Sequence, residues 1–179
     1  SRRAAIWLDV DPDRCGIPEI IFDKEFGFEM WTDYALKVPM YFIKRDHKYI
    51  DMTHYTFKDF LEGKCTDISQ DVSLKDWEDH LTTLFPQARL KHYLEIRSMD
   101  ACNWDLICSQ PAFWVGILYD DEILDKIKEI TEDWTEEDRK YLNQRVPEEG
   151  LKTVFKERKL IAFAQDFFEL SKKGLKKRN

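Results

Sequence analysis

The chain has 179 residues, a formal net charge of −7 at pH 7, and 43% hydrophobic and 14% aromatic residues. This composition argues against a disordered chain, and the length suits one domain with a real core, or part of a larger one. The acidic balance argues against a general binder of nucleic acid or membrane surfaces, because such partners require a basic face. The longest apolar run, Pro111 to Tyr119, is much shorter than the about 20 residues that span a bilayer.

The cysteines give little sign of metal or redox chemistry. The chain contains four of them, and no two form a C-x-x-C pair: Cys15, Cys65, Cys102 and Cys108. We therefore expect neither a zinc site nor thioredoxin-like chemistry. Their sparse use predicts a protein of the reducing cytoplasm.

The first part of the chain is expected to hold most of the strands. Short apolar or alternating runs predict strands at Ala4 to Val10, Glu19 to Phe22, Val38 to Ile43 and Lys48 to Met52. Between the second and third of these, Glu29 to Leu36 predicts a short helix that ends before Pro39.

Three aspartates alternate at Asp9, Asp11 and Asp13, a spacing that also occurs in calcium-binding loops. An EF-hand loop needs glycine at its sixth position, where this chain has Arg14, so we do not expect calcium here. Aspartates often accept backbone N–H bonds in turns, and we interpret this segment as a turn.

Two later segments carry helix-start signals. Thr56 is followed three residues later by Asp59, and Ser73 by Asp76, which is the spacing of a capping box. Gly63 and Pro86 are expected to end these two elements. His80 lies near the apolar stripe of the second helix, and we interpret it as a structural residue and not as a ligand.

The stretch from Arg89 to Asp100 predicts a single strand whose side chains alternate between two faces. The apolar face carries Leu90, His92, Leu94 and Ile96, and the charged face carries Arg89, Lys91, Tyr93, Glu95 and Arg97. A strand half buried and half in water explains this pattern. The alternative is that the charged face of the strand binds a ligand. Glu95 and Arg97 would lie roughly 7 Å apart on one face, and would bind a divalent metal and a phosphate of the same ligand.

Beyond Asp100 the sequence predicts helices. Pro111 suits the first turn of a buried helix that runs to Tyr119, and Thr135 with Asp138 caps a helix that ends at Pro147. Apolar stripes predict two further helices, over Ile123 to Ile130 and over Lys159 to Leu175. Strands first and helices later predict an α+β fold, with part of an antiparallel β-sheet in residues 1–100 and a helical region in residues 101–179.

Several collinear motifs resemble the plant-type and proteobacterial glutamate–cysteine ligases. The strongest block joins Leu81-Thr82-Thr83-Leu84-Phe85-Pro86, Arg89-Leu90-Lys91 and Tyr93-Leu94-Glu95-Ile96-Arg97. Further matches are Arg3 with Ile6-Trp7, Asp33-Tyr34-Ala35-Leu36, Val38-Pro39-Met40-Tyr41-Phe42 and Pro111-Ala112-Phe113-Trp114-Val115-Gly116. This resemblance implies a glutamine-synthetase-like catalytic sheet.

The resemblance implies an ATP-dependent ligase that joins the γ-carboxylate of L-glutamate to L-cysteine through a γ-glutamyl phosphate, with Mg²⁺ present. This is the first step of glutathione biosynthesis. The implied roles are metal binding for Glu95 and contact with the transferred phosphate for Arg97, while Arg89 and Lys91 add positive potential for ATP. On the amino-acid side, the resemblance implies that Arg3 and Trp7 lie near glutamate and that Tyr34 and Tyr41 form pocket walls.

In the resembled family a long segment precedes the first matching residue. We therefore expect the C-terminal portion of a single catalytic domain, inactive alone, with the other metal carboxylates upstream. After Arg97 the family continues Gly-Ala-Asp-Gly-Gly, whereas this chain has Ser98-Met99-Asp100-Ala101-Cys102, so its loop shape is expected to differ. Plant members carry a regulatory cysteine pair, but here Met52 takes the first position and Cys65 lacks a partner nearby, so we expect no such switch.

Two other functions are compatible with the sequence. The chain is either a non-catalytic structural or partner-binding fragment, or part of a related carboxylate–amine ligase with another amino acceptor. The second alternative stays open because Tyr34 and Tyr41 cannot by themselves specify cysteine. Under the ligase hypothesis the partners are small molecules, with no nucleic acid and no membrane.

Overall fold

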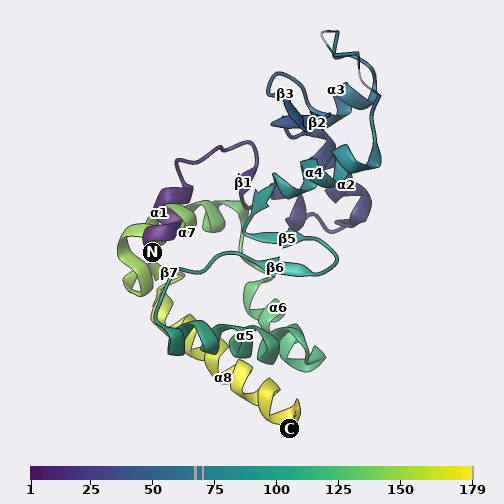
Figure 1. The fold of residues 1–179 in the computed structure, drawn as a ribbon. Coiled ribbons are helices and arrows are strands. Elements are labelled where there is room, and N and C mark those ends of the chain that lie inside the picture. The colour runs from purple at the N-terminus through teal and green to yellow at the C-terminus, as the bar shows by residue number, and fades with distance from the viewer. Residues whose placement is uncertain (67, 70, 179) are drawn as a thin grey trace. The chain divides into compact units, whose positions relative to one another are not determined.

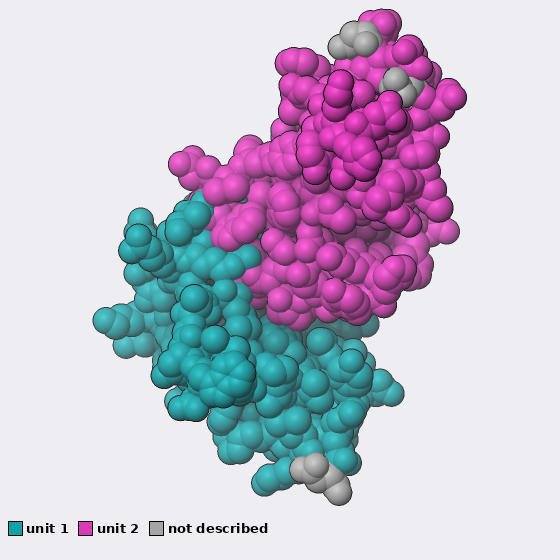
Figure 2. Space-filling view, in the orientation of Figure 1, with its two compact units in different colours: residues 1–6, 99–179 teal, residues 7–98 magenta. Residues whose placement is uncertain are grey.

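The protein is described here by a computed structural model that covers residues 1–66, 68–69 and 71–178. It divides into two compact units, one of residues 7–98 and one of residues 1–6 with 99–179 (Figure 2). Helices and short paired strands occur in both units, which confirms the α+β class. Within the described residues the strands form four two-stranded sheets, of which only the β1–β4 pair is parallel. No helix in this part of the chain has the length and apolar character of a membrane span.

Residues 7–98 contain most of the strands (Figure 1). After α1 (Arg2–Trp7), the elements in chain order are β1 (Cys15–Gly16), the 3₁₀ helix η1 (Glu19–Phe22), α2 (Phe28–Lys37), β2 (Phe42–Arg45), β3 (Lys48–Asp51), α3 (Phe57–Leu61), α4 (Leu74–Thr82), β4 (Phe85–Pro86), β5 (Ala88–Leu90) and β6 (Leu94–Ile96). The helices predicted around Glu29 and after Thr56 and Ser73 are confirmed as α2, α3 and α4, and the strand predicted from Lys48 as β3.

Both predicted capping boxes form. The Thr56 hydroxyl accepts a hydrogen bond from the Asp59 N–H at 3.1 Å, and the Asp59 carboxylate accepts one from the Thr56 N–H. Ser73 and Asp76 repeat this arrangement at the start of α4. Gly63 follows α3 with a φ of 68°, in the left-handed region that glycine adopts without strain.

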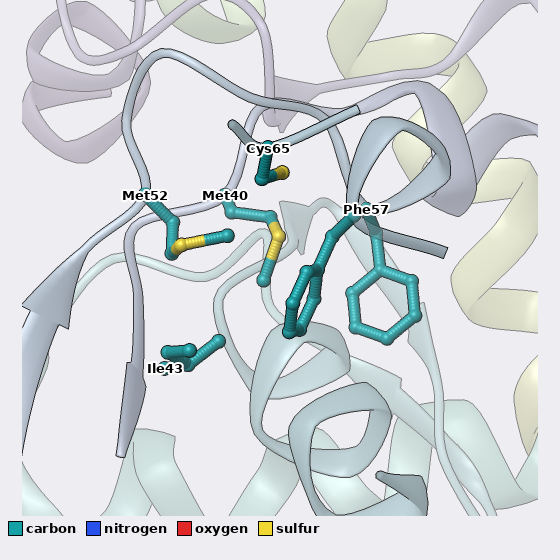
Figure 3. Packing of buried hydrophobic residues seen from close by; sticks show 6 residues of the cluster. Met40, Ile43, Met52, Phe57 and Cys65 are labelled. Carbon is teal, nitrogen blue, oxygen red and sulfur yellow. The ribbon is translucent and has the colours of Figure 1, made fainter. Parts of the chain in front are cut away.

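Apolar packing holds the β2–β3 hairpin against α3. The buried residues of this core are Met40, Ile43, Met52, Phe57, Phe60 and Cys65, and Figure 3 shows their side chains gathered beside one another. A second core of Trp31, Ala35, Val38 and Leu84 joins α2 to the end of α4. His80 is 2% exposed, and its Nε2 lies 2.8 Å from the carbonyl oxygen of Ala35, so its structural interpretation agrees with the packing.

Two of the predicted strands are wrong, and a third is displaced. Residues Arg2–Trp7 form α1 and not a strand, because the Ala-Ala pair favours a helix and the run of apolar residues is too short to reveal a period. Glu19–Phe22 is a 3₁₀ helix that starts after Pro18. The strand predicted from Val38 to Ile43 begins only at Phe42 and continues to Arg45.

The single strand predicted from Arg89 to Asp100 is also wrong, because the chain reverses at residues 91–93 and forms a hairpin (Figure 1). Strands β5 and β6 pair with Arg89 opposite Glu95 and Leu90 opposite Leu94. Cross-strand partners lie on the same face of a sheet. Because Leu94 comes four positions after its partner Leu90, an even number, the alternation passes through the turn unchanged, and the pattern could not reveal the reversal.

Residues 99–178 form a largely helical unit. Its elements are α5 (Trp104–Leu118), α6 (Asp121–Thr131), α7 (Glu136–Glu149), the 3₁₀ helix η2 (Gly150–Lys152), β7 (Val154–Phe155), β8 (Arg158–Lys159) and α8 (Leu160–Arg178). Helices α5 and α8 cross at two glycines, Gly116 and Gly174, where an added Cβ would overlap the backbone of the facing helix. The Ser171 hydroxyl donates a hydrogen bond to the Phe113 carbonyl at 2.8 Å and fixes this crossing.

The predicted proline positions in this unit are wrong. Pro111 lies inside α5 and not in its first turn, and α7 continues through Pro147 to Glu149. The helix around residues 112–119 was expected to be buried on all sides, but only Gly116 and Ile117 of α5 are buried. The cap that Thr135 and Asp138 form at the start of α7 is confirmed.

Candidate functional site

The β5–β6 hairpin gathers three charged side chains on one face. Arg89 and Glu95 are direct cross-strand partners, and the Arg89 Nε donates a hydrogen bond to Glu95 Oε2 at 2.6 Å. Arg97 follows β6, and its Nη1 lies 3.5 Å from Glu95 Oε1. Two guanidinium groups therefore flank one carboxylate. We call Arg89, Glu95 and Arg97 the Glu95 cluster.

Arg89 is held by the protein around it. Its side chain is 8% exposed, and its Nη1 donates hydrogen bonds to the carbonyl oxygens of Thr82 and Leu84, each at 3.1 Å. These carbonyls lie at the C-terminal end of α4, where unpaired carbonyls and the helix dipole favour a cation. The guanidinium therefore joins the end of a helix to the carboxylate of Glu95.

Arg97 is held less completely. Its guanidinium carbon lies 5.9 Å and 5.4 Å from the ring centroids of Trp7 and Phe85, and its side chain is 18% exposed. Its Nε is buried and has no hydrogen-bond acceptor among the described residues. A buried donor without an acceptor costs about 1–3 kcal/mol. This donor is therefore suited to an anionic oxygen of a ligand.

The charge of Glu95 suits a metal ion. The hydrogen bond from Arg89, followed by the charges of Arg89, Arg97 and Lys91, holds the pKa of this carboxyl below its usual range against the opposing effect of burial. The side chain is 31% exposed. Mg²⁺ needs only one or two protein carboxylates when phosphate oxygens and water complete its shell. No group of three potential metal-ligating side chains occurs in the part of the chain described, so such an ion would rely on Glu95 and on ligand oxygens.

Two other residues predicted for phosphate and glutamate binding, Lys91 and Arg3, belong to different units. Lys91 is exposed at the hairpin turn and lines a cavity of about 630 Å³ with Trp31, Trp77 and His92. Arg3 belongs to the other unit, where its backbone N–H donates a hydrogen bond to Asp100 Oδ1 at 2.8 Å. Of the predicted residues, the structure thus brings together Trp7, Arg89, Glu95 and Arg97.

A second polar cluster, missed in the sequence, surrounds Arg14. Its side chain is 3% exposed, and it donates to Asp11 Oδ2 at 2.7 Å, to the Pro39 carbonyl at 2.8 Å and to Thr83 Oγ1 at 3.3 Å. The Tyr41 hydroxyl donates to the same Asp11 oxygen at 2.6 Å, and the Arg14 guanidinium lies 3.5 Å from the Tyr41 ring centroid. We call Asp11, Arg14, Tyr41 and Thr83 the Arg14 cluster.

The Arg14 cluster fixes the turn that was predicted around the three aspartates. Burial raises the pKa of Asp11, but the hydrogen bonds from Tyr41 and Arg14 outweigh it and keep that pKa below its ordinary value. Burial and the hydrogen bond to Asp11 raise the pKa of the Tyr41 phenol. The only local sign of this network was the Asp-x-Asp spacing. Its other partners, Pro39 and Thr83, are distant in sequence, so no local pattern could have revealed them.

Cys15 interacts with charges of both clusters, and Tyr34 with Arg14 of the second. The thiol of Cys15 has a pKa raised by burial and by Asp11, while the charges of Arg14 and Arg97 oppose this rise. Tyr34 packs on Trp31 with ring centroids 5.5 Å apart, and burial, together with a smaller contribution from Cys15, raises the pKa of its phenol. The two tyrosines predicted as pocket walls are thus part of the packed scaffold beside the hairpin.

Comparison with known proteins bears on the family of this chain. The profile of the Glutamate-cysteine ligase family 2 (GCS2) matches residues 1–179. The chain belongs to this glutamate–cysteine ligase family. It is 49% identical to "Glutamate--cysteine ligase, chloroplastic" of Solanum lycopersicum and 50% identical to the protein of the same name from Arabidopsis thaliana, in each case over 99% of this chain and 34% of the relative. It is also 49% identical to "Glutamate--cysteine ligase A, chloroplastic" of Oryza sativa subsp. indica, over 99% of this chain and 36% of the relative.

The family resemblance inferred from the motifs is therefore confirmed. The chain spans about a third of the length of these ligase-family relatives. The expected cytoplasmic location is contradicted, because these relatives are named chloroplastic. Sparse cysteine use indicates a reducing surrounding but does not tell one such compartment from another.

Proposed function

We propose that this chain is part of an ATP-dependent glutamate–cysteine ligase of the plastid, which joins the γ-carboxylate of L-glutamate to the amine of L-cysteine. The observation that carries the proposal is the Glu95 cluster, in which an ionised carboxylate lies beside a guanidinium whose buried Nε has no acceptor among the described residues. Many enzymes use a metal ion and a phosphate in this way, and the family membership of the chain favours a ligase among them.

The reaction needs activation because a carboxylate is a poor electrophile. Transfer of the terminal phosphoryl group of ATP to the γ-carboxylate of glutamate gives an acyl phosphate and ADP. The amine of cysteine then displaces phosphate and forms the amide. Most of the catalysis in such a transfer comes from positioning and from charge neutralisation.

Arg97 and Glu95 have different roles in this proposal. Arg97 donates to the oxygens of the transferred phosphoryl group, where a fixed cation is worth most in a site that excludes water. Glu95 supplies a carboxylate for Mg²⁺, which when bound neutralises phosphate charge. Lys91 adds positive potential at the hairpin turn. Arg3 and Trp7 are proposed on the glutamate side, and Tyr34 and Tyr41 as walls of the amino-acid pocket.

The proposal extends to how the activity is divided along the polypeptide. We propose that residues 1–179 are the C-terminal portion of a single catalytic domain and are inactive alone, because no group of metal-ligating side chains among the described residues would help Glu95 to hold the metal. ATP turnover by residues 1–179 with glutamate and cysteine measures this. Robust turnover would contradict it.

The test of the activity uses the full gene product that contains these residues. Incubation with L-glutamate, L-cysteine, ATP and Mg²⁺ should yield γ-glutamylcysteine, with one ADP and one phosphate for each product molecule, as measured by mass spectrometry. Absence of this product would contradict the proposal. A panel of other amines tests the related-ligase alternative, since product with another acceptor and none with cysteine would assign a different substrate.

A further inference from the structure

The two arginines that flank Glu95 differ in what their donors bind. Three hydrogen bonds tie the Arg89 side chain to protein acceptors, one to Glu95 and two to carbonyls at the end of α4. Arg97 has an ion pair at 3.5 Å and a buried Nε without an acceptor in the described chain. Arg89 is also the less exposed, with 8% of its side chain accessible against 18% for Arg97.

A side chain bound in this way is poorly suited to contact a phosphate. To reach one, Arg89 would have to leave the carbonyls of Thr82 and Leu84, which would then lose their donor in a buried place. Its Nε bond would also leave Glu95. The same three bonds are well suited to fix the direction of the Glu95 carboxylate, because one end of the guanidinium is anchored on a helix and the other holds Oε2 at 2.6 Å.

We propose that Arg89 is a positioning residue, which fixes the orientation of the Glu95 carboxylate through Oε2, and that it does not itself contact ATP. This inference rests on the proposed function of the Glu95 cluster. Groups that bind a metal ligand from behind typically contribute about 10–100-fold to metal affinity. Arg89 should therefore act on the metal through Glu95, while Arg97 acts on the phosphate.

A double-mutant cycle in the full gene product tests this role. Mn²⁺ serves as the probe, and its binding is measured by electron paramagnetic resonance in the presence of a non-hydrolysable ATP analogue. We expect Arg89→Met to weaken Mn²⁺ binding by about tenfold or more. In a Glu95→Gln background, the same change should alter Mn²⁺ binding by less than about twofold, because the residue through which Arg89 acts is already lost.

The matched control is Arg158→Met, which removes an arginine that pairs with Asp166 at 2.7 Å in the other unit. This control should leave Mn²⁺ binding unchanged. An equal loss of Mn²⁺ affinity from Arg89→Met in both backgrounds would overturn the positioning role. An unchanged Mn²⁺ affinity of Arg89→Met with Glu95 present would overturn it too. If the full gene product makes no γ-glutamylcysteine, the proposed function is wrong. If it makes γ-glutamylcysteine but Arg89→Met leaves Mn²⁺ binding unchanged, only the positioning role is wrong.

A second measurement needs no substitution, in case Arg89 variants do not fold. Nuclear magnetic resonance of protein labelled with ¹⁵N-arginine observes the Nε–H group of each buried arginine. Addition of the ATP analogue without metal should shift the Arg97 Nε–H signal and leave that of Arg89 in place. A shift of the Arg89 signal by the analogue alone would show that Arg89 contacts the nucleotide and would overturn the proposal.

Discussion

The Arg14 cluster and the Glu95 cluster are made of the same kinds of group but are completed to different degrees. Both place a guanidinium against a carboxylate and an aromatic ring. All three kinds of nitrogen of Arg14 donate to protein acceptors, and its side chain is 3% exposed. In the Glu95 cluster the carboxylate is 31% exposed, and Arg97 Nε has no acceptor within the described residues.

This difference separates a structural network from a binding site. A buried polar network whose members are all satisfied fixes the parts of the chain that it joins. A buried donor without an acceptor lowers the stability of the folded protein, and such a donor is explained where a bound ligand supplies the acceptor. The Arg14 cluster should therefore govern stability and the Glu95 cluster should govern binding, and four predictions test this division.

The largest expected effect is on turnover. Arg97→Met in the full gene product should lower kcat by about 10²–10³-fold, because it removes a donor at a developing phosphate charge. The kcat of Arg97→Lys should lie between those of Arg97→Met and the wild type, since lysine keeps the charge but loses the planar fork. Thermal unfolding should change little. Full activity of Arg97→Met would remove Arg97 from the site.

The next effect is on stability. Arg14→Met should lower the free energy of unfolding by about 3 kcal/mol, because it removes the cation that pairs with Asp11 and leaves the Pro39 carbonyl without its donor. Urea unfolding measures this, with Arg158→Met as the exposed control. A loss no larger than that of the control would show that the Arg14 cluster does not hold the turn.

A smaller effect separates the two possible roles of Tyr41. Tyr41→Phe removes the hydroxyl that donates to Asp11, and it should cost about 1 kcal/mol of stability. Activity at saturating substrate should stay near the wild-type level. Unchanged stability would show that the hydroxyl does not hold Asp11, whereas a raised KM for an amino-acid substrate would support the proposed place of Tyr41 in the wall of the substrate pocket.

The smallest effect is on acid stability. The pKa of Glu95 is lower in the folded protein than the unperturbed value of about 4.3, so the unfolded chain binds its proton more readily. This contribution to stability is present above the unfolded pKa and is lost as pH falls through the folded one. Glu95→Gln should therefore flatten the fall in unfolding free energy below about pH 4.3. An unchanged slope would show that Arg89 does not hold the carboxylate.

Local signals in the sequence predicted local structure well. Thr56 with Asp59, Ser73 with Asp76, and Thr135 with Asp138 each start a helix, because a capping box is satisfied within one turn. The hairpin was missed because its turn, Lys91-His92-Tyr93, lacks the glycine, asparagine or proline that usually marks a reversal.

The candidate site was predictable only in part, for a related reason. Glu95 and Arg97 share a face in a strand and in this hairpin alike, so their proximity followed from spacing two residues apart. The engagement of Arg89 with Thr82 and Leu84 depends on where the end of α4 lies relative to β5. The Arg14 cluster depends on contacts between segments far apart in sequence, which no periodicity encodes.

The central claim is that Glu95 faces a metal-bound nucleotide and does not merely balance two arginines. The most direct test compares γ-glutamylcysteine formation by Glu95→Gln and by Glu148→Gln, an exposed glutamate of the other unit, in the full gene product. The account predicts that Glu95→Gln stays folded but loses turnover, and that Glu148→Gln keeps wild-type turnover. Wild-type turnover by a folded Glu95→Gln protein would contradict it.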